Sequence, residues 1–348
     1  MRMLRLRVGL FALVAMLLMG SLTYVTPVFA ESAADFYVGK TLVAIVFASP
    51  GGGYDTWTRL IAPYLQKYSG ADKVIVRNMP GAGGAVCWNY MQNVAKPNGL
   101  QIAVGSGLSM VMDELLDEPA VKYKFAKFNW LGRMTADVSS VGVSKDSPYR
   151  SLDDINKAPL FKFGTTGRTN MFGLMPIAVG EALGAKNFKV VAGYRGGAQV
   201  QLATIRQEVS ALCSSPPSIL HLIKSGDIRV IAVLGYERWQ DIPEVPTLVE
   251  LLPDIPAEGK KWVDIIFTAN ALGRVVVTSP GVPKDRVEFL TDAIKKSLHD
   301  PEFVAKGEKI GKYVFYLSPA EQMKQIKALT LSPEDKKHLK YLVFEKYS

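Results

Sequence analysis

The chain has 348 residues, of which 48% are hydrophobic and 21% are charged. This balance supplies enough apolar material for a sizeable core and excludes a disordered or fibrous protein. The formal net charge is +9, but the basic residues are spread along the chain without an RNA- or DNA-binding signature, so no nucleic-acid partner is expected.

Residues 1–30 have the pattern of a secretory signal peptide. Three arginines fall within the first seven residues, an apolar run extends from residue 8 to residue 22, and small residues precede the expected cleavage after Ala30. We therefore expect an exported, periplasmic protein, with an uncleaved N-terminal anchor as the alternative. Loss of the three arginines leaves 38 Lys and Arg against 32 Asp and Glu, a net charge of +6. The remaining chain has no run of about 18 apolar residues, so it is not expected to span a membrane.

The first elements predicted after the signal are a strand and a helix. Thr41–Ala48 is almost continuously apolar and ends at a Ser-Pro-Gly-Gly-Gly sequence, which is typical of a strand buried on both faces of a parallel sheet. Apolar residues then recur at helical spacing from Trp57 to Tyr68. Asp55 is in the N-cap position of this helix, and Pro63 is expected to bend it.

The same order of elements repeats along the chain. Strands Lys73–Val76 and Gln101–Val104 are separated by a Gly-rich turn, Asn78–Gly84, and by a helix, Ala85–Val94. A second set begins near residue 138, with one helix from Met171 to Gly184 and another over Ala198–Gln207. Its predicted strands are Val138–Val143, Phe161–Gly164, Phe188–Val191, Val209–Leu212 and Arg229–Leu234. Such β-α-β order predicts two lobes with mainly parallel sheets and helices on both faces.

The last third of the chain holds a Pro-rich stretch, a predicted strand at Val275–Thr278 and a predicted helix at Asp285–Leu298. Periodicity leaves open whether this third completes the first lobe or forms a separate C-terminal layer. Cys87 and Cys213 fall in different sets of elements, and we expect them to be buried and unpaired. The three histidines are isolated from one another and from both cysteines, so no metal site and no cofactor is predicted.

Three Gly-rich loops each follow an apolar strand and precede a predicted helix: Pro50–Asp55, Gly164–Asn170 and Gly193–Ala198. In open α/β sheets, ligands collect at the carboxyl ends of the strands, where such loops meet helix N-termini. The free backbone amides there favour an anion, and glycine allows it to approach the backbone closely. The loops therefore predict a site for a small carboxylate.

Several side chains in these loops have two interpretations. Arg168 fits a bidentate ion pair with a carboxylate, but it also fits a solvated loop arginine. Asp55 is either a structural cap or a ligand contact, and Tyr54 and Tyr194 either line the cleft or pack beside it. Motifs for catalysis or nucleotide binding are missing from the sequence, including the nucleophile elbow, the P-loop and the dinucleotide fingerprint. We therefore predict a binding protein rather than an enzyme.

These loops, in this order, resemble the receptor family of tripartite tricarboxylate transporters, the periplasmic solute-binding proteins called Bug or TctC proteins. The matching segments are Pro50-Gly51-Gly52 with Asp55, Arg59–Pro63, Arg77–Gly84, Gly193–Ala198, and Arg238 with Pro243–Thr247 and Glu250. They fall within roughly residues 41–320. The chain departs from the family pattern in the extra segment around residues 251–274.

The resemblance implies an α/β fold of two Rossmann-like lobes with a ligand cleft between them, as in type II periplasmic binding proteins. Lobe one would comprise residues 31–137 and 235–348, and lobe two residues 138–234. Loops of both lobes would bind the ligand. The implied contacts are Ala48, Gly52, Gly53, Tyr54, Asp55, Ser106 and Gly107 in lobe one, and Thr165, Thr166, Arg168, Thr169, Asn170, Tyr194, Gly196, Gly197 and Ala198 in lobe two.

The resemblance also implies a function and its partners. The protein would be a monomer that captures a small organic carboxylate by lobe closure and delivers it to a membrane permease of one large and one small subunit. Two alternatives remain: a receptor that passes its closed state to a sensor, and a hydrolase on the same scaffold. A hydrolase would need Ser106 or Ser215 within hydrogen-bond reach of a histidine such as His221.

Overall fold

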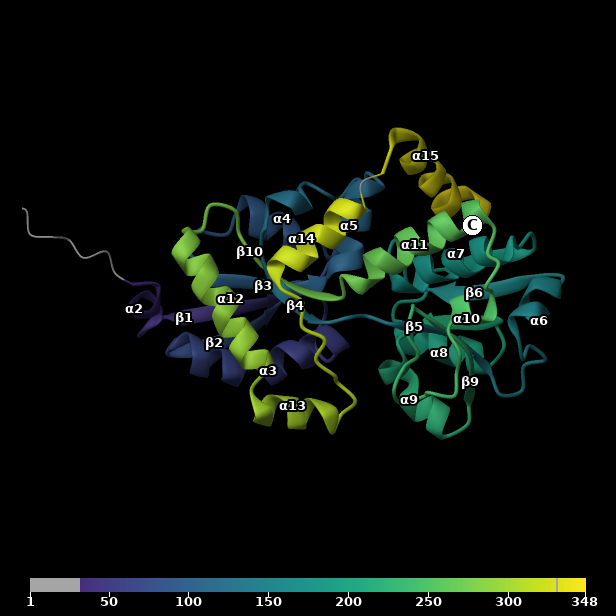
Figure 1. Ribbon diagram of the computed structural model, residues 1–348, viewed down its shortest axis with the longest axis horizontal. Helices are drawn as coiled ribbons and strands as arrows, with labels where there is room; N and C mark the ends of the chain where they lie inside the picture. Colours follow the sequence, from purple (N-terminus) through teal and green to yellow (C-terminus); the bar gives the residue numbers. More distant parts are fainter. Residues whose placement is uncertain (1–31, 330) are drawn as a thin grey trace, which may run out of the picture.

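A computed structural model describes residues 32–329 and 331–348, and the predicted signal peptide lies outside this range. The described residues form two lobes side by side, each built around one five-stranded sheet (Figure 1). No helix in the described part of the chain is long and apolar enough to cross a bilayer. The predicted α/β class with two lobes is confirmed.

The sheet of lobe one has the strand order β2-β1-β3-β10-β4. Its strands are β1 (Thr41–Val46), β2 (Lys73–Asn78), β3 (Gln101–Ser106), β4 (Asn129–Thr135) and β10 (Arg274–Thr278). Strand β1 pairs in parallel with β2 and β3, whereas β10 is antiparallel to both of its neighbours. The late part of the chain therefore returns to complete the first sheet, one of the two possibilities that periodicity left open.

The sheet of lobe two repeats this plan in the order β7-β6-β8-β5-β9. Its strands are β5 (Ser139–Ser144), β6 (Phe161–Thr165), β7 (Phe188–Ala192), β8 (Ala211–Ser214) and β9 (Ile228–Leu234). Strand β6 is parallel to β7 and β8, and β5 is antiparallel to β8 and β9. In each lobe, one strand is antiparallel to both of its neighbours: β10 in lobe one and β5 in lobe two. Each is the first strand that the chain forms after crossing from the other lobe.

Helices cover both faces of each sheet. In lobe one, α3 (Gly53–Ser69) and α12 (Lys284–Leu298) pack on one face around an apolar core. The other helices of this lobe and of the segments that connect the lobes are α2 (Ala33–Tyr37), η1 (Ala82–Gly84), α4 (Ala85–Asn93), α5 (Gly107–Leu115), η2 (Phe125–Lys127), α11 (Ala257–Ala271), α13 (Pro301–Glu308) and α14 (Pro319–Ala328). Those of lobe two are α6 (Leu152–Lys157), α7 (Met171–Leu183), α8 (Gly197–Ile205), α9 (Pro216–Lys224) and α10 (Leu248–Leu251), which packs on β9.

Several elements were not predicted from the sequence, among them β4 and α11, and one strand was misplaced. The edge strand β4 contains Gly132 at φ 131°. This glycine interrupts the apolar pattern, so the sequence did not indicate a strand there. Helix α11 occupies most of the extra segment 251–274; its Gly259 packs so closely on α7 that an added Cβ would lie 2.3 Å from the carbonyl oxygen of Glu181. Strand β8 was predicted at Val209–Leu212 but begins and ends two residues later.

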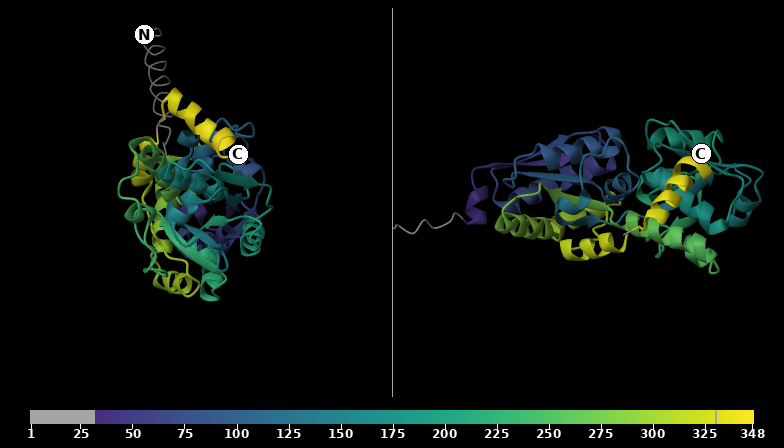
Figure 2. Two further views of the ribbon diagram at one scale, coloured as in Figure 1. Left: turned by 90° about the vertical axis from the view of Figure 1, so that its right-hand side faces the viewer. Right: turned by 90° about the horizontal axis from the view of Figure 1, so that it is seen from above.

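The C-terminal segment packs on lobe two. After α15 (Pro333–Tyr341), the chain ends in a π-helical turn, η3 (Leu342–Lys346), which lies over lobe two in Figure 2. The carbonyl oxygen of Tyr347 accepts a hydrogen bond from the N–H of Val190, and its hydroxyl donates to Glu181 at 2.6 Å. The predicted domain division placed this segment with lobe one, but these contacts belong to the second sheet and its helix α7.

Candidate functional site

A cleft of about 840 Å³ lies between the two lobes. Lobe one contributes the loops that follow β1, β2 and β3, together with α5, and lobe two contributes the loops that follow β6 and β7. These are the carboxyl ends of the parallel strands, where an α/β sheet presents its ligand site. A cavity of this size accommodates a small molecule.

Five helices begin at this cleft. The residues at or beside their first turns that line it include Gly52 of α3, Ala85 of α4, Ser106 of α5, Asn170 of α7 and Gly197 of α8. Ser106 caps α5 by accepting a hydrogen bond from the N–H of Ser109. Within the described residues, no side chain caps α3, α4, α7 or α8. Uncapped N–H groups at the positive ends of helix dipoles attract an anion.

Nine of the sixteen residues implied by the resemblance line the cleft. They are Ala48, Gly52, Tyr54, Ser106, Thr166, Arg168, Thr169, Asn170 and Gly197. The other seven lie outside its lining and have structural surroundings of their own. They are Gly53, Asp55, Gly107, Thr165, Tyr194, Gly196 and Ala198.

Close packing and local hydrogen bonds explain most of these seven positions. A Cβ on Gly53 would lie 3.1 Å from the Arg274 guanidinium, and one on Gly107 would lie 2.6 Å from Leu272. The hydroxyl of Thr165 is fully buried and accepts a hydrogen bond from the N–H of Gly167. Of the three residues near the start of α8, Tyr194 packs on a small apolar core of lobe two, Gly196 is the N-cap of α8, and Ala198 is exposed.

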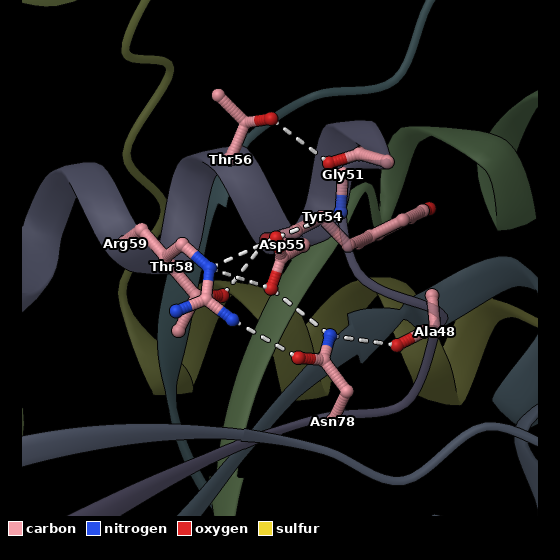
Figure 3. Close-up of polar contacts among 9 residues, drawn as sticks. Ala48, Gly51, Tyr54, Asp55, Thr56, Thr58, Arg59 and Asn78 are labelled. Atoms are coloured by element: carbon pink, nitrogen blue, oxygen red, sulfur yellow. Dashed lines mark hydrogen bonds and ion pairs between the residues drawn. The ribbon is translucent and has the colours of Figure 1, made fainter.

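The carboxylate of Asp55 joins the first loop to helix α3 and to the end of β2 through hydrogen bonds (Figure 3). The predicted N-cap role is wrong, because Gly52 is the N-cap and Asp55 is the third helical residue. Its carboxylate accepts hydrogen bonds from the N–H of Gly51 (2.9 Å), from Nε of Arg59 (2.9 and 3.0 Å) and from Nδ2 of Asn78 (2.9 Å). The hydrogen bond from Arg59 is the main cause that lowers the pKa of Asp55 to about 2. Both oxygens are thus engaged in joining β2 to the loop.

Tyr54 connects the cleft to the passage between the lobes. Its ring lines the cleft and meets Phe47 edge to face, with the centroids 4.7 Å apart. Its hydroxyl donates to Asp137, which lies between β4 and β5 and also accepts from Nε of Arg274 at 3.3 Å. Burial, reinforced by the charge of Asp137, raises the pKa of Tyr54 far above its usual value, so the hydroxyl remains a donor.

Arg168 lines the cleft and is bound to the C-terminal segment. Its Nη1 donates to the carbonyl oxygen of Val343 at 3.2 Å and to the hydroxyl of Ser348 at 2.6 Å. Phe344 of the same segment also lines the cleft. Sequence reasoning could not find this wall, since its residues lie more than 170 positions from Arg168.

The loop between β2 and α4 also lines the cleft, from Pro80 through Gly84. Gly84 has φ 112°, and a Cβ there would lie 2.3 Å from the ring of Phe47, so only glycine fits. The resemblance rests partly on this segment, but it was not among the predicted contacts. The signal was present, because this loop, like the other three, is Gly-rich and joins a strand to a helix.

A buried acid lies on the lobe-one side of the cleft. Asp113 of α5 is 3% exposed, and its Oδ1 has no hydrogen-bond partner within the described part of the chain. Burial raises the pKa of Asp113 to about 7; the nearby carboxylate of Glu118 adds to the rise, and a hydrogen bond from Thr169 opposes it. Sequence reasoning missed this residue, which is the one acid in the apolar first two turns of its helix.

Chemistry other than binding receives no support from the remaining candidates. Both cysteines are free and buried, as predicted, and burial raises the pKa of the Cys87 thiol to about 12. In residues 32–329 and 331–348, no three His, Cys, Asp or Glu side chains are placed to hold a metal ion. The hydroxyl of Ser215 pairs with that of Ser218, and His221 is exposed. No described hydrogen bond joins a histidine to Ser106 or Ser215.

A family model described as "Tripartite tricarboxylate transporter family receptor" matches residues 58–335. The chain belongs to the tripartite tricarboxylate transporter receptor family. Protein BugT of Bordetella pertussis is 26% identical over 256 residues, which cover 71% of this chain and 76% of BugT.

Solved structures show the same fold. The periplasmic binding protein BugD superimposes with a TM-score of 0.68 at 20% identity, over 88% of this chain and 98% of that one. A Rhodopseudomonas palustris protein solved with adipate has a TM-score of 0.67 at 19% identity, over 87% of this chain and 96% of that one. The fold and family expected from the sequence are therefore confirmed: this is a periplasmic solute-binding protein of the TctC type.

Proposed function

We propose that this protein captures a small organic carboxylate in the cleft between its lobes and delivers it to a tripartite tricarboxylate-type membrane transporter. The observation that carries the proposal is the convergence on one cleft of four helix N-termini without side-chain caps, two from each lobe; at α4, the first N–H already donates to the carbonyl oxygen of Ala82. Each contributes ~0.3–1 kcal/mol to binding an exposed anion and up to ~2 kcal/mol when partly buried. An anion that bridges both lobes would stabilise the closed arrangement.

The basic side chains of lobe two support the same ligand class. Arg168 and Arg195 line the cleft and would give charge-assisted hydrogen bonds to a carboxylate. The structural relative from R. palustris was solved with adipate, a dicarboxylate, which makes linear dicarboxylates the first compounds to try. Micromolar affinity needs about 8 kcal/mol, which several such contacts exceed before the cost of association is subtracted.

A ligand screen tests this proposal. Protein without residues 1–30 is heated with mono-, di- and tricarboxylates and with neutral amides of the same carbon skeletons, and hits are measured by calorimetry. A ligand that binds only the folded state raises the melting temperature, so carboxylates should raise it and their amides should not. If the amides stabilise the protein equally, or if no carboxylate binds, the proposal is wrong.

The expected partners are a permease of one large and one small subunit, and the protein would act as an exported monomer. A sensor partner instead of a permease would use the same ligand-induced closure. Uptake of radiolabelled ligand by cells separates the two: deletion of the receptor abolishes transport if it serves a permease, and leaves transport intact if it serves only a sensor.

A further inference from the structure

The carboxylate of Asp113 faces the ligand cleft without a basic partner. Its side chain lines the cleft, is 97% buried and leaves Oδ1 without a hydrogen bond among the described residues. A buried carboxylate in this state is costly, because nothing replaces the water it has lost. Apart from a hydrogen bond from Thr169, nothing in the described part of the chain compensates for this cost, and no salt bridge to Asp113 exists there.

The charges that line the cleft are divided between its two walls. Asp113 and Glu118 lie on the lobe-one wall, where the N–H of Glu118 bonds to the carbonyl oxygen of Asp113. Arg168 and Arg195 lie on the lobe-two wall. A second carboxylate of a ligand placed beside Asp113 would be the third negative charge in one poorly solvated place. A cationic group there would instead supply the partner that the carboxylate lacks.

We infer that the ligand carries an ammonium group as well as a carboxylate, with Asp113 accepting hydrogen bonds from the ammonium while the helix N-termini and the arginines of lobe two bind the carboxylate. This inference rests on the proposed function and narrows its substrate class to amino acids and other amino carboxylates. Asp113 would then determine specificity, and the neighbouring Thr169 of lobe two would adjust to the bound ligand on closure.

Matched ligand pairs test the inference on the protein without residues 1–30. Calorimetry at pH 8 compares succinate with aspartate, glutarate with glutamate, adipate with 2-aminoadipate, and 3-phenylpropionate with phenylalanine. In at least one pair, the amino member should bind about 10- to 100-fold more tightly than its partner, the range expected for hydrogen bonds to a charged group. Its affinity should rise between pH 6 and pH 8, as Asp113 loses its proton.

Two variants separate the role of Asp113 from a general effect of charge. Asp113→Asn should weaken the preferred amino carboxylate about 10- to 100-fold and change its desamino partner less than about threefold. Glu118→Gln, which removes the neighbouring negative charge at the partly exposed rim, should have a smaller effect. The melting temperature of unliganded Asp113→Asn should be unchanged or higher, because the unpaired buried charge is gone, so a loss of binding is not a loss of folding.

The outcomes distinguish the two proposals. If desamino carboxylates bind as tightly as their amino partners, or if Asp113→Asn weakens both members of a pair equally, the ammonium site is wrong and the carboxylate receptor stands. Proton uptake on binding of a dicarboxylate would likewise overturn it, since Asp113 would then be protonated and would donate a hydrogen bond to a ligand carboxylate. If neither these pairs nor any carboxylate of the wider screen binds, both proposals fall.

Discussion

The Asp55 network gives a stability prediction that can be worked from its contacts. Asp55→Asn keeps the size of the side chain but replaces one acceptor oxygen by an amide that cannot accept. Four hydrogen bonds from Gly51, Arg59 and Asn78 now end on the two oxygens. A hydrogen bond to a charged group contributes ~1.5–3 kcal/mol. Because the variant retains some of them, we expect it to lower the free energy of unfolding by about 2 kcal/mol.

The pH dependence of this effect has a definite sign. The pKa of Asp55 is lowered to about 2 in the folded protein from an ordinary value of 3.8. Its stabilisation is therefore fully present above pH 4 and is lost as the pH falls towards 2. Urea titrations of the wild type and Asp55→Asn, followed by tryptophan fluorescence, should differ at pH 7 and converge near pH 2.

Asp254→Asn provides the control, since Asp254 is exposed. Surface substitutions of this kind change stability by less than about 0.5 kcal/mol. The reasoning would be refuted if Asp55→Asn were no more destabilising than Asp254→Asn at pH 7, or if its effect were as large at pH 2.5 as at pH 7.

Two further predictions concern the loop after β2 and the C-terminal segment. Gly84→Ala should destabilise the protein more than Gly226→Ala does: both glycines have positive φ, which costs about 1–3 kcal/mol for alanine, but only at Gly84 would the new Cβ meet another side chain, Phe47. Urea titrations of the two variants measure the difference, and equal losses would contradict the close approach. Tyr347→Ala should cost about 3–5 kcal/mol because its ring is 1% exposed, whereas Tyr341→Ala, at 44% exposed, should cost far less; calorimetric unfolding checks this, and similar losses would show that the segment is not part of lobe two.

The fold could be predicted to a large extent because its signals are local. Apolar runs that end near glycine marked most strands, and helical spacing marked the longer helices α3, α7 and α12 together with α4 and α8. The first loop shows the limit of local signals: Asp55 was predicted as the N-cap of this helix, but the N-cap is Gly52. Asn78, which lies 23 residues further on, holds Asp55 inside the helix and so fixes Gly52 as the cap.

Site residues could be predicted only where they lie in a Gly-rich loop that directly follows a strand. Gly52, Asn170 and Gly197 follow strands in glycine-rich segments, and the structure brings them together. Asp113 and Phe344 have no such signal. The raised pKa of Asp113 results from burial and from its contacts with Glu118 and Thr169. Thr169 belongs to the other lobe, so this environment depends on how the two lobes are packed.

The geometry assigns affinity and specificity to different parts of the cleft. Arg168 was the strongest side-chain candidate for the carboxylate, but it already donates to Val343 and Ser348, so binding a ligand would exchange hydrogen bonds rather than add them. The amides of the four uncapped helices are fixed by their backbones and need no reorganisation. They respond to any carboxylate, so the amides should supply most of the attraction for the anion. Discrimination between carboxylates then depends on side chains that differ in charge along the cleft. Of these, Asp113 is the buried one, and its Oδ1 has no hydrogen-bond partner among the described residues.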